Sequence, residues 1–182
     1  MNRFVIVALF ALLAGFAMPA AKAQDKENQI YLDLKDGRVI IQLLPEAAPG
    51  HVKRIKELTR AGFYDGLKFH RVIEGFMAQT GDPRGDGTGG SGQRLKAEFN
   101  REKHVRGTLS MARAQSPDSA DSQFFICLAA ASYLDGQYTV WGKVVEGMEH
   151  VDKIKRGDRH NNGAVRDPDT IVKMQVAADA KN

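Results

Sequence analysis

Apolar residues occupy every second position in two neighbouring segments, residues 30–34 and 38–44. A period of two places successive side chains on opposite faces of an extended chain, which is typical of a strand with one buried face. Asp36-Gly37 lies between the two segments and is a common dipeptide at hairpin turns. The pattern therefore predicts an antiparallel hairpin near the start of the folded region.

The period changes in the next segment, residues 45–61. Val52, Ile55 and Leu58 recur at helical spacing with charged residues between them, and Gly62 follows as a stop signal. These residues predict a helix over 45–61 with one face directed to the core.

The remaining apolar runs are short. Met148, Val151 and Ile154 predict a second helix that ends near Gly157. Many short strands with two isolated helices favour a closed or sandwiched antiparallel sheet over alternating βαβ units, in one domain without repeats or linkers. The runs that predict the further strands are bounded by Gly, Asp or Pro and cover 68–73, 107–112, 123–128, 139–144 and 170–176.

Residues 1–23 have the organisation of a secretory signal peptide. Asn2-Arg3 supplies a positive start, residues 4–17 are apolar or glycine, and Ala21-Lys22-Ala23 is a small-x-small cleavage site. The apolar run is short for a membrane span, and an uncleaved N-terminal anchor is the alternative. We therefore expect cleavage near Ala23-Gln24, a single mature domain over 24–182 without membrane attachment, and a periplasmic or otherwise exported location.

The composition argues against a nucleic-acid partner and against a reactive cysteine. The formal net charge of +4 falls to +2 without Arg3 and Lys22, because the leader contains no acid. The remaining cations are scattered among acids without a basic block, so nucleic acid is not expected as a partner. Cys127 is the single cysteine and has apolar neighbours, which predicts a buried, unreactive thiol.

A glycine-rich segment, residues 81–92, resembles a phosphate loop only superficially. It lacks the Gly-Lys-Ser/Thr ending of such loops and does not lead into a helical pattern. We interpret it as a long surface loop with several turns that need positive φ.

Two of the predicted strands place polar groups among apolar ones. In 123–128, Gln123 and Phe125 share a face opposite the apolar set Phe124, Ile126 and Leu128. In 68–73, Arg71 shares a face with Phe69 and Ile73, opposite His70 and Val72. A half-buried guanidinium is costly unless it has a partner or a function. Either Arg71 pairs with a carboxylate at the sheet rim, or it serves a half-polar groove.

Several ordered motifs resemble the cyclophilins, a family of peptidyl-prolyl cis–trans isomerases. The resemblance spans roughly residues 28–176, is similar to the short exported bacterial branch, and implies a closed eight-stranded antiparallel β-barrel capped by two helices. The motifs are Gly62-Phe63-Tyr64-Asp65-Gly66, Phe69-His70-Arg71, Gly75-Phe76-Met77, Gln79, Gly81-Asp82, Gly87-Thr88-Gly89-Gly90, Ser122-Gln123-Phe124-Phe125-Ile126 and Leu134-Asp135-Gly136.

The resemblance also implies roles for individual residues. Arg71 is the expected catalytic arginine, with Gln79 beside it, and no metal or cofactor is required. The expected substrate-binding residues are His70, Phe76, Met77, Ala112, Arg113, Gln123, Phe125, Tyr133, Leu134 and Tyr138.

Three of these positions differ from the best-known members of the family. Arg113 stands where asparagine is common, Tyr133 where tryptophan is common, and Tyr138 where histidine is common. The differences affect the rim of the site more than its chemistry. We therefore expect isomerase activity together with weak binding of the cyclic peptide cyclosporin.

The implied function is acceleration of rotation about X-Pro bonds in exported proteins, which assists their folding. The implied partners are proline-containing unfolded or partly folded polypeptides, and a monomer is expected. One alternative is a binding module or chaperone of the same fold with little catalysis, which would have no need of Arg71. A sugar-binding barrel that uses Tyr133, Tyr138 and Trp141 has little support, because no acidic ligand set accompanies them.

Overall fold

The computed structural model describes residues 26–181, and the predicted signal peptide therefore lies outside the described residues. One antiparallel sheet has the strand order β3-β4-β6-β5-β7-β2-β1-β8. Its strands are β1 (Gln29–Leu34), β2 (Gly37–Leu43), β3 (Arg71–Ile73), β4 (Met77–Thr80), β5 (Thr108–Met111), β6 (Phe124–Cys127), β7 (Val140–Glu146) and β8 (Lys173–Val176).

Within residues 26–181, two helices and four short 3₁₀ turns accompany the sheet. The helices are α2 (Pro49–Arg60) and α3 (Met148–Val151), and the turns are η1 (Pro117–Ser119), η2 (Ser132–Leu134), η3 (Arg159–Asn161) and η4 (Ala177–Asp179). No helix within residues 26–181 is long and apolar enough to span a membrane.

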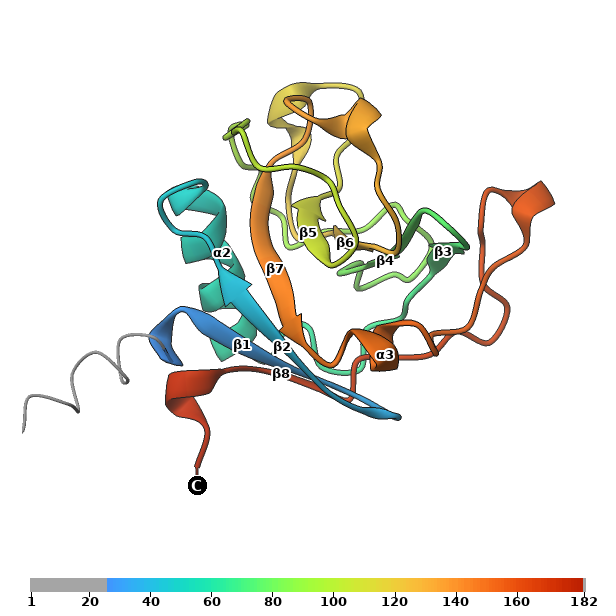
Figure 1. Cartoon of the computed structure of the whole chain (residues 1–182), viewed down its shortest axis with the longest axis horizontal. Coiled ribbons are helices and arrows are strands. Elements are labelled where there is room, and N and C mark those ends of the chain that lie inside the picture. Colours follow the sequence, from blue (N-terminus) through green and yellow to red (C-terminus); the bar gives the residue numbers. More distant parts are fainter. Residues whose placement is uncertain (1–25, 182) are drawn as a thin grey trace, which may run out of the picture.

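The long strand β7 joins the two halves of the sheet, because it pairs with β2 on one side and β5 on the other (Figure 1). The register shifts by a bulge between Ile40 and Ile41 and again between Leu109 and Ser110. Bulges increase local twist and bend a sheet, which explains why this one curls.

The prediction of a closed barrel overstates how far the sheet closes. The end strands β3 and β8 share no ladder, and the edges meet at one bridge, Lys68 with Thr170. Its hydrogen bonds run from Phe69 N to Asp169 O (2.9 Å) and from Ile171 N to Leu67 O (2.9 Å). The chain is irregular on both sides of this bridge, so the pairing does not extend and the sheet remains a curled half-barrel.

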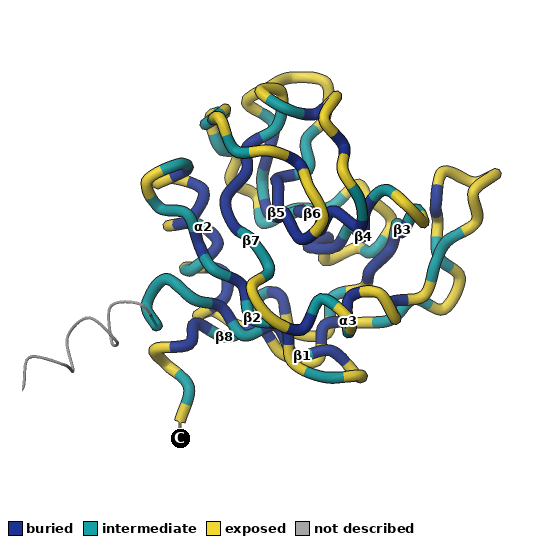
Figure 2. The backbone as a smooth tube through the Cα atoms, viewed as in Figure 1, coloured by how far each residue is buried: buried dark blue, intermediate teal, exposed yellow. Residues whose placement is uncertain are grey.

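The main core lies between the inner face of the sheet and α2. Val52, Ile55 and Leu58 of α2 are buried, as their spacing predicts. The helix begins at Pro49 instead of Pro45, because a residue before proline disfavours the helical conformation and Pro49 is suited to the first turn. Figure 2 shows that buried residues concentrate in the strands, whereas the outer loops are mainly exposed.

The strand predictions are confirmed except at two places. β4 was missed, because its four residues are too few to show a period. Phe69 belongs to the main core together with Val72, and not to the face of Arg71. β3 begins only at Arg71, so the alternation assumed across residues 69–71 does not hold.

The second predicted helix is shorter than expected, since α3 ends at Val151.

Gly81 fixes the crossing between the end of β4 and the segment that leads into β6. Its φ of +86° lies in the left-handed region, and a Cβ there would collide with the backbone carbonyl oxygen of Ser122. Ser122 Oγ in turn donates to Gly81 O at 2.7 Å. Gly66 has a similar φ of +77°, but a Cβ there would meet nothing within 4 Å.

We expect Gly81→Ala to lower the free energy of unfolding by about 3 kcal/mol, because backbone strain and a backbone clash add. The control Gly66→Ala carries the strain alone and should cost about 1 kcal/mol. Urea unfolding of both variants tests the difference. Equal losses would show that the close contact with Ser122 does not constrain this crossing.

Candidate active site

One row of paired residues crosses three adjacent strands. Arg71 on β3 is opposite Gln79 on β4, and Gln79 is opposite Phe125 on β6. Directly opposed residues in an antiparallel pair project to the same face with their Cβ atoms about 5 Å apart. The register therefore brings an arginine, an amide and an aromatic ring together on the outer face of the sheet.

A second apolar cluster covers this outer face. Met77, Phe125, Cys127, Ala131 and Leu134 are its buried members. Phe124 and Ile126 point to the main core instead, so the alternation predicted for β6 is confirmed. Burial raises the pKa of the Cys127 thiol to about 12, which agrees with the predicted unreactive cysteine.

The cluster forms the floor of a concave site of about 110 Å³, which we call the apolar pocket. Nine of the twelve residues predicted for the site line it. They are Arg71, Phe76, Met77, Gln79, Ala112, Arg113, Phe125, Leu134 and Tyr138.

Arg71 is held at the edge of the apolar pocket by neutral acceptors. Its Nη1 donates to Gln79 Oε1 (3.1 Å), while Nε and Nη2 donate to the backbone and side-chain oxygens of Asn162 (both 3.0 Å). No carboxylate among residues 26–181 forms an ion pair with it, so the rim salt bridge that the sequence left open is absent from this region. Burial lowers the pKa of Arg71, but an arginine stays charged at neutral pH.

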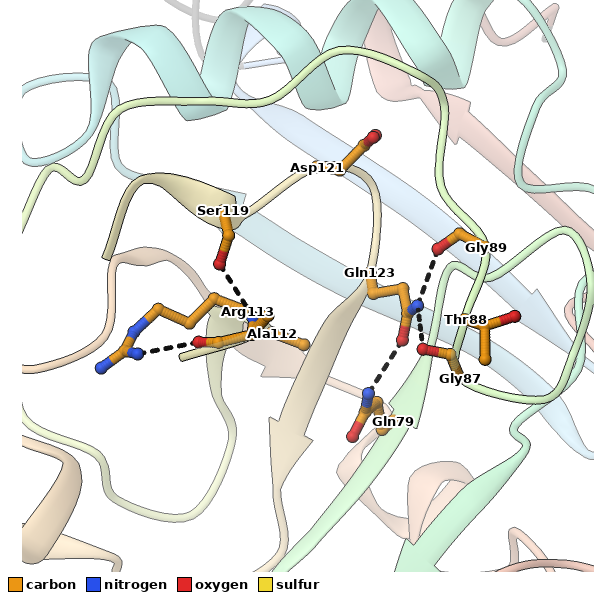
Figure 3. Close-up of a pocket in the computed structure, with 10 residues that line it drawn as sticks. Gln79, Gly87, Thr88, Gly89, Ala112, Arg113, Ser119, Asp121 and Gln123 are labelled. Carbon is orange, nitrogen blue, oxygen red and sulfur yellow. Dashed lines mark hydrogen bonds between the residues drawn. The ribbon is translucent and has the colours of Figure 1, made fainter. Parts of the chain in front are cut away.

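A chain of amides fixes the orientation of Gln79. Gln79 Nε2 donates to Gln123 Oε1 (2.9 Å), and Gln123 Nε2 donates to the carbonyl oxygens of Gly87 (3.0 Å) and Gly89 (2.8 Å), as Figure 3 shows. Carbonyl oxygens can only accept, so the Gln123 nitrogen must face the loop and its oxygen must face Gln79. The Gln79 oxygen is consequently left for Arg71.

The glycine-rich loop is therefore part of the site as well as a surface loop. Its shape depends on Asp82, whose carboxylate accepts from the backbone N–H groups of Arg84 (2.8 Å), Asp86 (3.1 Å) and Gly87 (2.6 Å). Burial by itself would raise the pKa of Asp82, but these backbone donors outweigh it and hold the pKa below its usual value.

A second concave site of about 230 Å³ adjoins the first, and we call it the polar pocket. Gln123 lies here and not in the apolar pocket, whereas Gln79, Ala112 and Arg113 line both. The polar pocket is also lined by the loop and by the segment that leads into β6, through Gly87, Thr88, Gly89, Ser119 and Asp121 (Figure 3). Ala114 lines it as well.

Arg113 does not reach freely across the site. Its guanidinium carbon stacks over the Tyr138 ring at 4.4 Å, and its nitrogens donate to the carbonyl oxygens of Gln137, Ala114 and Gln115. Arg113 and Tyr138 thus form one wall of the apolar pocket. The two side chains stabilise each other through this cation–π contact.

His70 and Tyr133 lie at the margin. His70 is buried with its ring close to Gly87 of the glycine-rich loop, and its burial lowers the pKa of the ring. Tyr133 is 62% exposed and does not line the apolar pocket. Its ring packs on Phe76 with 5.8 Å between centroids, which places it on the rim.

Sequence reasoning missed Asn162. The only signal was the dipeptide Asn162-Gly163, which is typical of a turn with positive φ and carries no sign of a partner on a distant strand. Within residues 26–181, no three His, Cys, Asp or Glu side chains come together as a metal site.

Comparison with known proteins agrees with this geometry. Residues 29–176 match the family model of the cyclophilin type peptidyl-prolyl cis-trans isomerases. A probable peptidyl-prolyl cis-trans isomerase of Brucella suis is 52% identical over 96% of this chain and 95% of its own length.

Solved structures lead to the same family. The cyclophilin AquaCyp293 from Hirschia baltica superposes with a TM-score of 0.76 at 28% identity, covering 86% of this chain and 76% of its own. A cyclophilin type isomerase of Cryptosporidium parvum, crystallised in the presence of the dipeptide Ala-Pro, has a TM-score of 0.75 at 29% identity, covering 85% of this chain and 99% of its own. Because the family model covers residues 29–176 and these relatives match most of its length, this chain belongs to the cyclophilin-type peptidyl-prolyl cis–trans isomerases.

Proposed function

We propose that this isomerase acts on X-Pro bonds of exported polypeptides, with Arg71 and Gln79 as its catalytic residues and the apolar pocket as the site of the proline ring. One observation carries the proposal. A guanidinium without a carboxylate partner in residues 26–181 borders a pocket floored by Met77 and Phe125. The pocket suits a small apolar ring, and the charge suits a polar group attached to it.

The chemistry needs no covalent step. Rotation about an amide has a barrier of about 18–20 kcal/mol, because the nitrogen lone pair is shared with the carbonyl. At X-Pro bonds the two isomers are close in energy but exchange in tens of seconds or more. In the twisted transition state the proline nitrogen regains a localised lone pair, and a positioned donor can stabilise it or the adjacent carbonyl.

Arg71 has donors available for this purpose. Three of its five N–H groups have oxygen acceptors, and a fourth reaches only Met77 Sδ at 3.9 Å, which is a weak acceptor. Because Nη1 lies beside Met77, it faces the apolar pocket. A guanidinium that binds the twisted bond better than the planar one lowers the barrier.

The reduction of the rotation barrier can be divided between the charge of Arg71 and the apolar pocket. Bringing the exchange to milliseconds requires about 10⁴-fold, or about 5–6 kcal/mol. A charge-assisted hydrogen bond contributes about 1.5–3 kcal/mol, so Arg71 supplies about half. The rest of the barrier reduction comes from holding the proline ring among Phe76, Phe125 and Leu134 and from excluding water. It also comes from holding the peptide on one side of the bond while the other side rotates.

Proline-containing peptides are the proposed partners. The Cryptosporidium parvum relative was crystallised in the presence of Ala-Pro, which supports a proline ligand here. We propose that the protein acts on these peptides as a monomer. A module that only bound such peptides would have no use for a charge held in this way, and a protease-coupled assay on a short proline peptide separates the two functions.

Export is proposed from the first 23 residues alone, whose order of charge, apolar run and small-x-small site is that of a cleaved leader.

We expect Arg71→Ala to lower kcat about 10–100-fold, the loss of one charge-assisted donor, while peptide affinity and melting temperature change little. Arg71→Lys is the matched control, because it keeps the charge but not the planar fork, and it should recover only part of the rate. The protease-coupled assay measures both. Near-wild-type turnover in Arg71→Ala would remove Arg71 from the mechanism.

We expect Tyr133→Trp to tighten inhibition by cyclosporin about 5–150-fold, because an indole adds an N–H donor and a broader face at the exposed rim. Turnover should stay within about twofold, since Tyr133 lies outside the apolar pocket. Tyr133→Phe, which adds no donor, is the control and should not tighten inhibition. Equal inhibitor affinity in all three proteins would show that this position does not set sensitivity.

We expect mass spectrometry of the extracytoplasmic fraction to find a chain that starts at Gln24. Ala23→Arg should remain full length, because the cleavage site requires a small residue. Recovery of uncleaved wild-type protein from the cytoplasm would contradict the proposed export.

A further inference from the structure

Arg71 is gripped along one edge by a single residue, Asn162, which lies 91 positions away in the sequence. The Asn162 backbone oxygen accepts from Nε and its side-chain oxygen accepts from Nη2, both at 3.0 Å. Two parallel contacts on adjacent nitrogens fix the plane of a guanidinium as well as its position. Gln79 holds the opposite nitrogen at 3.1 Å, so the group is clamped from two sides.

The identity of residue 162 is restricted by its backbone. Asn162 follows η3 and has a φ of +50°, in the left-handed region. Glycine, asparagine and aspartate adopt this region most readily. Of the three, only asparagine has a side-chain oxygen that can accept from Arg71 without bringing a negative charge. One residue type thus satisfies the turn and the second hydrogen bond to Arg71.

The base of the loop is fastened to β3. Val72 N donates to Gly163 O (2.8 Å), Gly157 N donates to Val72 O (2.9 Å), and Val165 N donates to His70 O (3.1 Å). Gly163 packs so closely on Ile73 that a side chain would collide with it. The residues on both sides of Asn162 are therefore held against β3, although η3 at the tip projects from the body in Figure 1.

We propose that Asn162 is a positioning residue for the isomerase reaction, and that the loop from Gly157 to Val165 exists in part to place it. It aligns the guanidinium so that the Nη1 edge faces the apolar pocket, and it does so without neutralising the charge, because both acceptors are uncharged. The inference rests on the proposed catalytic role of Arg71.

The critical variant is Asn162→Gly. Glycine tolerates the left-handed φ and keeps the backbone acceptor, so the loop should remain folded while Nη2 loses its partner. We expect kcat to fall about fivefold with little change in KM, because the peptide is still bound but meets a less ordered donor. Asn161→Ala is the matched control. It removes a neighbouring exposed amide whose side chain makes no hydrogen bond to Arg71, and its turnover should match that of the unmodified protein.

A double-mutant cycle with Arg71→Ala separates positioning from a structural role. If Asn162 acts through Arg71, Asn162→Gly should have no further effect on kcat in the Arg71→Ala background. Melting temperatures of all variants serve as the check on folding. The same fivefold loss in both backgrounds, or no loss in the Arg71 protein, would overturn the inference.

The cycle also distinguishes the role of Asn162 from the role of Arg71. If Arg71→Ala is slow while Asn162→Gly is fully active, the catalytic role of Arg71 stands and only the positioning role of Asn162 is rejected. If Arg71→Ala is fully active, both roles are rejected.

Discussion

A guanidinium that must keep its full charge beside an apolar pocket needs acceptors that hold it without pairing with it. Arg71 meets this constraint through Asn162 on one edge and Gln79 on the other, both of them neutral. A carboxylate in either place would hold the group as firmly but would cancel the field that it exerts on a bound peptide. Much of the surrounding structure serves to bring these two acceptors to the same point.

The Gln79 side of the clamp extends back to the glycine-rich loop. The loop carbonyl oxygens of Gly87 and Gly89 accept from Gln123 and so set the orientation of its amide. The Gln123 oxygen then accepts from Gln79 and sets the orientation of that amide in turn. Asp82 shapes the loop through the backbone N–H groups that it accepts. A segment without regular structure therefore fixes a hydrogen bond at Arg71, the proposed catalytic residue, which is the organisation expected of a preorganised site.

The two faces of the sheet carry separate apolar clusters. The inner face carries the main core with α2, whereas the outer face of β4 and β6 carries the small cluster around Met77 and Phe125. Alternate residues of one strand thus serve different purposes, since Phe124 belongs to the core and Phe125 to the pocket. Arg113 and Tyr138 form a wall of the apolar pocket on this outer face and are not part of the main core.

The sequence by itself determined the local features of this protein. Its period of two located most strands, its period near 3.6 located α2, and the parity around Phe125 separated pocket from core, because these patterns depend only on neighbouring residues. Its motifs identified the family and nine residues of the apolar pocket. The tertiary structure alone decided where β3, β4 and β6 pair, that the sheet stays open between β3 and β8, and that Asn162 reaches Arg71. Those outcomes depend on contacts between distant segments and on irregular backbone at residues 67–70 and 157–165, and no local periodicity encodes either.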